Sequence, residues 1–194
     1  DDQVIQVRLT TGDSQIIMAN KHGRAIRFHE STVREMGRTA TGVRGMTLDE
    51  TGDDEVIGMI CIKDPEKETV MVVSEQGYGK RSEIEDYRIT NRGGKGVKTL
   101  NITEKTGNLV AIKSVTDEND LVIINKSGIT LRMKVADVRI MGRATQGVRL
   151  INLEKRNDEI ASVCKVLSET ESDSSNSENI DSASEINEAE ASET

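Results

Sequence analysis

The sequence predicts an all-β protein, a propeller-like array of about three four-stranded blades plus the closing strand of an earlier blade. Three observations support this fold class. One residue pattern recurs three times along the 194 residues, short apolar stretches occupy matching places in every copy, and no segment has a convincing helical period. Roughly four short strands in each repeat of about 52 residues are typical of a propeller blade.

The repeat aligns without internal gaps over three stretches, 20–44, 74–98 and 125–149. Gly23, Gly77 and Gly128 correspond, and a second glycine follows each of them 19 residues later. The shared pattern is Gly-x3-Arg-x6-Arg-x3-Arg-x3-Gly-Val, followed by Arg or Lys. A single blade leaves apolar faces that only a neighbouring blade can cover, so we expect the blades to stack around or along an axis.

Each repeat begins with a strand, a hairpin turn and a return strand. The first strands are expected at 15–19, 69–73 and 121–124, and the return strands at 25–28, 80–82 and 129–133. Glycine supplies the positive φ that such a turn needs. Closing strands are expected at 56–60, 109–112 and 160–163, and residues 4–7 match them, 52 residues before the first. We therefore expect the sequence to begin in the closing strand of an earlier repeat, with more blades upstream in the parent chain.

The composition divides the chain into a folded part, 1–167, with repeats near 15–62, 69–115 and 121–166, and a tail, 168–194. The tail holds nine acidic residues, eight serines and no base. Such a segment cannot bury enough apolar surface to offset its ordering entropy, so we predict that it is disordered. Its tethered negative charge would compete with an anionic ligand for a basic surface, and the alternative is that it only aids solubility.

The charge is unevenly distributed. The net charge of −8 taken whole argues against nucleic acid, because phosphate binding needs Lys and Arg. The windows 21–44, 75–98 and 126–149, however, hold 18 of the 26 bases and only seven acids, a net charge of +11. Because repeats place equivalent positions on one face, the sequence predicts a continuous basic surface, which is typical of a polyanion binder.

The residues narrow the class of polyanion. Single-stranded nucleic acid is bound on aromatic platforms, and Phe28, Tyr78 and Tyr87 are too few and not in register. No helix-turn-helix or zinc-finger pattern is present to read a major groove. Sequence-tolerant contact with the backbone of a duplex remains, and it is favoured where DNA bends around a curved surface.

The candidate DNA-binding residues are the bases at repeated positions and one glycine-rich loop: Arg27, Arg34, Arg38, Arg44, Lys80, Arg81, Arg88, Arg92, Gly93, Gly94, Lys95, Gly96, Lys98, Arg132, Arg139, Arg143 and Arg149. Glycine lets the backbone approach a phosphate, and Arg and Lys supply charge. The alternative is structural. A repeated arginine can bind a neighbouring carboxylate or a strand end, and Gly42, Gly96 and Gly147 can occupy turns that need a positive φ.

The sequence predicts no catalytic residue and no metal site. His22 and His29 are the only histidines, and Cys61 and Cys164 each lie in an apolar run, which predicts reduced, buried thiols in a cytosolic protein. No nucleophile is accompanied by a base, and no phosphate-binding P-loop occurs. No apolar run reaches 18 residues, so no membrane span is predicted.

Several motifs together carry a family resemblance: 36–44, 77–81, 87–88, 91–97, 104–107 and 141–149. Over residues 1 to about 167 the chain resembles the C-terminal domain of the A subunit of DNA gyrase and, less closely, that of topoisomerase IV. The family's signature box is matched at Arg92, Gly93, Gly94, Lys95 and Gly96, whereas Thr90 and Asn91 stand where Gln and Arg are usual.

The resemblance implies a β-pinwheel that wraps double-stranded DNA around a basic rim. It implies a non-catalytic module of an ATP-dependent type IIA topoisomerase that introduces negative supercoils, with ATP and magnesium bound elsewhere in the holoenzyme. The implied partners are the catalytic core of the same polypeptide and the gyrase B subunit. The implied location is the cytoplasm, at the nucleoid. The alternatives are a propeller-like scaffold that binds acidic proteins, or the equivalent domain of topoisomerase IV.

Overall fold

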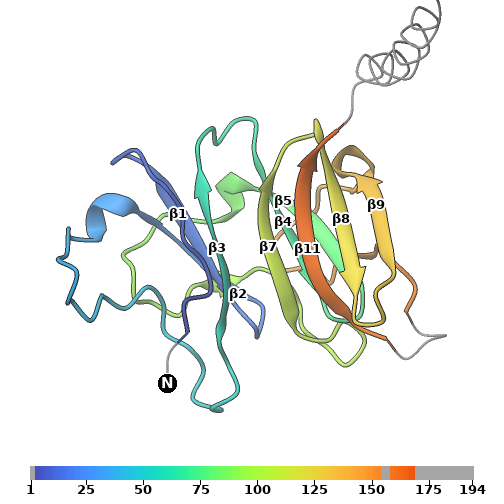
Figure 1. Ribbon diagram of the computed structural model, residues 1–194, viewed down its shortest axis with the longest axis horizontal. Helices are drawn as coiled ribbons and strands as arrows, with labels where there is room; N and C mark the ends of the chain where they lie inside the picture. The colour runs from blue at the N-terminus through green and yellow to red at the C-terminus, as the bar shows by residue number, and fades with distance from the viewer. Residues whose placement is uncertain (1–2, 154–157, 169–194) are drawn as a thin grey trace, which may run out of the picture.

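A computed structural model describes residues 3–153 and 158–168 (Figure 1). Every regular element among these residues is a β-strand or a single 3-10 turn, which confirms the all-β class. No helix in the described ranges is long and apolar enough to cross a membrane. The predicted tail from residue 169 onward lies outside the described residues.

The three predicted kinds of strand are confirmed in each repeat. The first strands are β1 (Gln15–Asn20), β4 (Thr69–Ser74) and β8 (Asn119–Asn125). The return strands are β2 (Arg24–His29), β5 (Tyr78–Glu83) and β9 (Thr130–Lys134). The closing strands are β3 (Val56–Ile62), β7 (Leu109–Val115) and β11 (Ile160–Leu167). A 3-10 turn follows each return strand: η1 (Glu30–Thr32), η2 (Ile84–Asp86) and η3 (Val135–Asp137).

The fourth strand of a blade comes from the following repeat. The sheets have the orders β3-β1-β2-β6, β10-β5-β4-β7 and β11-β8-β9. Strand β6 (Val97–Lys98) belongs to the second repeat and pairs with β2 of the first, and β10 (Val148–Arg149) pairs with β5 in the same way. The Gly-Val-Lys motif at 96–98 and the Gly-Val-Arg motif at 147–149 therefore lead into sheet-edge strands that hold successive repeats together, whereas the Gly-Val-Arg motif at 42–44 forms no strand.

Two glycines permit this exchange. Gly96 has a φ of 71°, and a side chain there would collide with the backbone of Ala25 in the preceding blade. Gly147 has a φ of 79°, and a Cβ there would lie 2.6 Å from the carbonyl oxygen of Gly79. Both positions need a residue without a side chain. Gly96 and Gly147 are therefore explained by the backbone conformation and the close packing of the blades, which was the alternative to a contact with phosphate.

The core is aliphatic and lies largely between blades. One cluster joins Ile17 and Ile60 of the first sheet to Val72 and Ile112 of the second, and another joins the second sheet to the third. Strand β3 packs against β7, and β7 packs against β11, so the closing strands meet where the three sheets face one another (Figure 1). The expected stacking of blades is therefore confirmed for the described part of the chain.

Two expectations are wrong. Residues 4–7 form no strand, although Gln6 Oε1 accepts a hydrogen bond from the backbone N–H of Met59 in β3 at 2.7 Å. The apolar side chains of this segment are exposed because no first strand of an earlier blade pairs with it within the described residues. The cysteines are also less buried than expected, since Cys61 is half-buried and Cys164 is exposed.

Candidate nucleic-acid interface

The basic windows contain three loops, and the second and third of these cross from one blade to the preceding blade. After η2, the second loop runs beside β2, where Thr90 donates from its backbone N–H to the carbonyl oxygen of Arg27 at 2.8 Å. After η3, the third loop runs beside β5, where Met141 makes the same contact with Arg81 at 2.8 Å. Each of these two loops then ends in the exchanged strand, β6 or β10. Equivalent bases of the second and third repeats therefore lie on equivalent loops, each beside the return strand of the preceding blade.

Three of the candidate DNA-binding residues are buried, and their proposed direct contact with DNA is corrected. Arg27 is 4% exposed, Arg81 is 5% exposed and Lys80 is fully buried. Arg27 Nη1 donates to the carbonyl oxygens of Ile84 and Tyr87 at 2.8 and 2.9 Å. These side chains lie beneath the loop of the next repeat, so they hold that loop in place.

Arg81 and Lys80 do the same for the third loop. Arg81 Nε donates to the carbonyl oxygen of Val138 at 2.9 Å, and Lys80 Nζ donates to that of Gly142 at 2.6 Å. Burial lowers the pKa of Lys80 to about 8, because a charged ammonium is disfavoured away from water. Ile26 and Leu131 occupy the equivalent positions in the other repeats, so Lys80 is a buried polar exception.

Arg92 and Arg143 are half-buried and connect successive loops. Arg92 Nη1 donates to the carbonyl oxygen of Arg44 at 3.1 Å, and its Nε donates to that of Thr32 at 2.9 Å. Arg143 Nη1 donates to the carbonyl oxygen of Lys98 at 2.9 Å. Because Arg44 and Lys98 are the last bases of their windows, these bonds join the loops across both repeat boundaries.

The remaining bases of the loops are exposed. We call them, together with Arg92 and Arg143, the basic belt; the exposed members are Arg34, Arg38, Arg44, Arg88, Lys95, Lys98, Arg139 and Arg149. Within the described residues Arg34, Arg88 and Arg139 form no ion pair with a carboxylate. The belt thus presents positive charge that no described acidic residue neutralises at these three repeated positions.

Arg132 lies outside this belt. It is the third-repeat equivalent of Arg27 and Arg81, but no loop of a following repeat covers it in the described residues. Its Nε forms an ion pair with Asp120 Oδ2 at 2.8 Å. Arg132 therefore has the structural role that was the alternative to DNA binding, because it pairs with a neighbouring carboxylate.

The glycine-rich loop is partly closed to ligands. Gly93 has a φ of 85°, and its N–H donates to the carbonyl oxygen of Gly45 at 2.6 Å, so that N–H is not available to a phosphate. Thr47 Oγ1 donates to the carbonyl oxygen of Gly93 at 2.6 Å. Gly94 and Lys95 remain exposed, which leaves a small part of the predicted loop accessible.

All three aromatic residues are buried. Phe28 is 2% exposed, Tyr78 is 7% exposed and Tyr87 is fully buried. Tyr78 Oη accepts a hydrogen bond from Arg149 Nη2 at 2.9 Å, and Lys105 Nζ lies 5.5 Å from the centre of its ring. No aromatic side chain is therefore free to stack on an unpaired base, in agreement with the exclusion of single-stranded nucleic acid.

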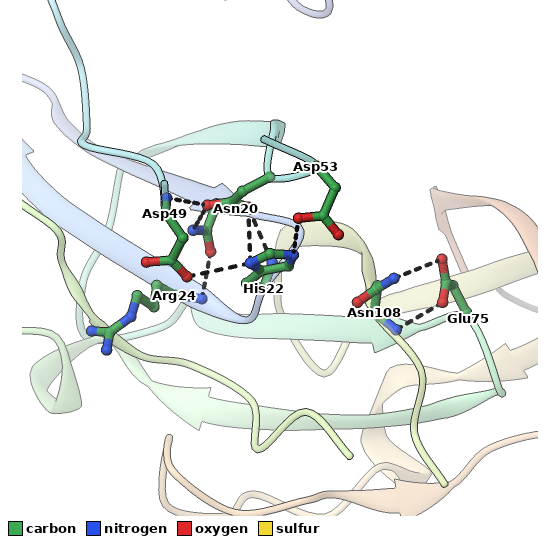
Figure 2. Close-up of polar contacts among 8 residues, drawn as sticks. Asn20, His22, Arg24, Asp49, Asp53, Glu75 and Asn108 are labelled. Carbon is green, nitrogen blue, oxygen red and sulfur yellow. Dashed lines mark hydrogen bonds and ion pairs between the residues drawn. The ribbon is translucent and has the colours of Figure 1, made fainter. Parts of the chain in front are cut away.

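His22 forms a cluster with aspartates that the sequence pattern did not indicate. Figure 2 shows its ring between carboxylates: Nδ1 lies 3.3 Å from Asp49 Oδ2, and Nε2 lies 3.4 Å from Asp53 Oδ1. Asp54, whose carboxylate accepts from the backbone N–H of His22 at 3.3 Å, is the third neighbour. Burial opposes protonation, but the hydrogen bonds and charges of these aspartates outweigh it and raise the pKa of His22.

The His22 cluster also has the spacing of a small cation site, since donor atoms of His22, Asp49 and Asp54 lie within 4.8 Å of one another. Both ring nitrogens already face carboxylates, however, which matches a protonated imidazolium. The cluster therefore ties the β1–β2 turn to the loop before β3. In the second repeat Glu75 and Asn108 make the corresponding tie, with Asn108 N donating to Glu75 Oε2 at 2.8 Å (Figure 2).

Fold and site together define a class of protein: a propeller-type repeat array whose blades exchange strands and whose connecting loops carry a basic belt. Comparison with known proteins gives the family. The family model described as "DNA gyrase C-terminal domain, beta-propeller" matches residues 14–63, 68–116 and 119–164. The chain belongs to the DNA gyrase C-terminal domain family.

The relatives agree with this assignment. The chain is 48% identical over 178 residues to the DNA gyrase A subunit of Staphylococcus aureus strain NCTC 8325, covering 92% of this chain and 20% of that protein. It therefore spans about a fifth of the length of this relative. The structure of a DNA gyrase A C-terminal domain matches with a TM-score of 0.74 and 28% identity, over 81% of this chain and 52% of that one.

A crystal structure of the C-terminal domain of DNA topoisomerase IV also matches, with a TM-score of 0.79 and 26% identity over 86% of this chain and 51% of that one. Both solved domains therefore share the fold of this chain. The sequence relatives, which are gyrase A subunits with 48% identity, favour the gyrase branch.

Proposed function

We propose that this chain is a non-catalytic module that binds double-stranded DNA along its basic belt and bends the duplex around the array of blades. The family and the belt support this proposal together. The observation that carries it is the pair of hydrogen bonds, Arg92 to Arg44 and Arg143 to Lys98, that join the cationic loops of three repeats into one surface.

The spacing of the bases in the belt and the burial of the aromatic residues favour double-stranded DNA as the ligand. Arg34, Arg88 and Arg139 recur once per blade and form no ion pair with a described carboxylate, so they are suited to phosphates, which recur along a duplex without regard to sequence. The burial of Phe28, Tyr78 and Tyr87 removes the stacking surfaces that single strands require. We propose the residues of the basic belt, with Gly94, as the DNA contacts, and the buried Arg27, Lys80 and Arg81 as supports for the loops.

In the complete enzyme, the bent duplex would be delivered to the catalytic core of the same chain and to the gyrase B subunit, in the cytoplasm at the nucleoid. ATP binding and DNA cleavage would reside there, and the wrapped duplex would give strand passage its direction toward negative supercoils. The acidic tail would compete with DNA for the belt, because nine tethered negative charges have a high local concentration.

A matched pair of charge reversals tests the proposal. Arg88→Glu with Arg139→Glu removes two exposed members of the belt, whereas Lys67→Glu with Lys126→Glu makes the same change in net charge at exposed lysines outside it. Duplex affinity, measured by mobility shift at constant salt, should fall for the first variant by about tenfold or more and stay nearly constant for the second.

Equal weakening by both variants would show that only net charge matters and would contradict a defined belt. Unchanged affinity in both would exclude the belt as the DNA contact, and an absence of duplex binding by the unmodified chain would favour the scaffold that binds acidic proteins. In a ligation assay with a nicked circle, the unmodified chain should also shift the linking number of the closed product, whereas the belt variant should not.

A further inference from the structure

A second concentration of positive charge lies away from the basic belt. Outside the three basic windows, residues 1–167 contain only eight bases against 18 acids. Four of these eight, Arg8, Lys63, Lys113 and Lys165, line one cavity of about 530 Å³. Half of the bases in an otherwise acidic part of the molecule are therefore gathered at one place.

The repeat brings these groups together. The cavity lies where the closing strands β3, β7 and β11 meet the segment before β1. Ile60, Lys113 and Cys164 line it, and they occupy equivalent positions, opposite Ile17, Met71 and Val122 of the first strands. The packing of three equivalent strands thus converges on a single site, to which Arg8 contributes from the N-terminal segment.

The cavity carries uncompensated charge. Glu68 is the one acidic residue in its lining, and its Oε1 already accepts from the backbone N–H groups of Lys63 and Asp64, while its Oε2 accepts from Ser114. None of the four cations forms an ion pair with a carboxylate in the described part of the chain. Four cations and one carboxylate leave a net charge of +3 in the lining.

Lys113 is the cation of the lining whose surroundings favour the charged form least. Burial lowers its pKa; the charge of Cys164 opposes this effect, and the neighbouring charges of Arg8 and Lys165 lower the pKa further. Its ammonium has no hydrogen-bond partner among the described residues. A half-buried cation among like charges is stabilised when an anion binds beside it.

The cavity is separate from the basic belt. In the sheet orders β3-β1-β2-β6 and β10-β5-β4-β7, the closing strands and the exchanged strands occupy opposite edges. Three strand spacings separate those edges, or about 14 Å. The lining of the cavity also contains no residue of the basic belt, so the two positive regions are distinct sites.

We propose that this cavity binds a small phosphate-bearing anion of about three negative charges, the class that includes inorganic pyrophosphate and nucleoside diphosphates. The charge of such an anion balances the lining. The volume lies within the range of about 300 to 1,000 Å³ usual for small-molecule sites. Lysine binds phosphate as a point charge without a fixed geometry, which suits a site built from four separate segments. The proposal goes beyond the DNA-binding function and does not depend on it.

The cysteines supply a direct readout. Cys61 and Cys164 are the only cysteines of the chain, and both line the cavity. Inorganic pyrophosphate is titrated into the full 194-residue chain, and calorimetry measures its binding. In a second experiment, mass spectrometry measures the rate at which iodoacetamide alkylates Cys164 at each pyrophosphate concentration. We expect saturable binding and a Cys164 alkylation rate that falls several-fold at saturation.

Charge-removing variants locate the binding. Lys113→Gln and Lys165→Gln should each weaken pyrophosphate binding about tenfold, whereas Lys67→Gln, an exposed lysine outside the cavity, should leave it unchanged. Lys165 is exposed, so its replacement does not disturb the core, and its variant keeps the test valid if Lys113→Gln is unstable. Duplex affinity of Lys165→Gln should equal that of the unmodified chain.

Three results would overturn the proposal. The first is a failure to locate pyrophosphate in the cavity: either the chain shows no saturable binding, or the cavity variants bind pyrophosphate as well as Lys67→Gln does. The second is protection of Cys164 by a short DNA duplex as strong as that by pyrophosphate, which would make the cavity part of the DNA surface. The third is pyrophosphate binding only after removal of residues 169–194, which would assign the cavity to the chain's own acidic tail.

Discussion

Arg143 donates a hydrogen bond from Nη1 to the carbonyl oxygen of Lys98 at 2.9 Å, and this bond joins the loop of the third repeat to that of the second. Arg92 and Arg44 form the equivalent pair one repeat earlier. A guanidinium has five N–H donors, so each arginine can hold the neighbouring loop and still present donors to a phosphate. The same contact therefore sets both the position and the continuity of the basic belt.

This arrangement predicts that charge alone is not enough at Arg143. Arg143→Lys keeps the charge but loses the planar fork that reaches the carbonyl oxygen of Lys98. We expect the free energy of unfolding to fall by about 1 to 2 kcal/mol and duplex affinity to fall with it. Denaturant titration and mobility shift measure the two effects. Unchanged values for both would show that the bond does not position the loop.

The strand exchange predicts different costs at two glycines with positive φ. Gly96→Ala adds backbone strain and a collision with Ala25, whereas Gly42→Ala, at a φ of 86°, meets no atom within 4 Å. We expect Gly42→Ala to cost about 1 kcal/mol and Gly96→Ala at least about 2 kcal/mol more. Thermal unfolding of the two variants provides the comparison, and equal losses would mean that β6 is not held closely against β2.

Lys80 predicts a rise in stability with pH. Its pKa is about 8 in the folded state against 10.5 in the unfolded chain, so between these values the unfolded state binds more protons. The free energy of unfolding should therefore increase from pH 8 to pH 10, where Tyr87 is still neutral because burial raises its pKa to about 12. Lys80→Met, which resembles Ile26 and Leu131 of the other repeats, should reduce this increase and leave only the part that the lowered pKa of Lys113 contributes. An unaltered pH profile in the variant would contradict the assignment.

His22 predicts the opposite trend near neutrality. Its pKa in the folded state is raised above 6.5, so the contribution of the imidazolium is complete below about pH 6.5 and is lost as pH rises through the raised value. Because the aspartates are partly exposed, the loss should not exceed about 1 kcal/mol. His22→Gln should flatten the melting temperature between pH 6 and pH 8, and a slope equal to that of the unmodified chain would exclude the cluster as its cause.

The fold could be predicted to the level of the blade. Glycine turns and apolar strands recur at fixed spacing, so β1, β4 and β8 and their partners follow from the pattern. The exchanged strands β6 and β10 are only two residues long, too short for any periodicity, and their pairing depends on a neighbouring repeat. The strand expected at residues 4–7 lacks a first strand to pair with in the described chain.

The site could be predicted only as a set of positions. Arg27, Arg92 and Arg88 all recur in the repeat, yet the structure makes them a buried support, a bridge between loops and an exposed base, respectively. Spacing cannot separate these roles, because burial depends on which loop of the next repeat covers the side chain. The His22 cluster and the cavity at Lys113 join residues distant in sequence, so no local motif indicates them.

The salt dependence of duplex affinity tests the central claim most directly. Arg34→Ala, Arg88→Ala and Arg139→Ala remove one exposed, equivalent base from each repeat. If each arginine binds one phosphate, the slope of log affinity against log salt should become shallower by about 0.9 in each variant and by about 2.7 in the triple variant. A triple variant whose slope equals that of the unmodified chain would contradict the basic belt as the DNA-binding surface.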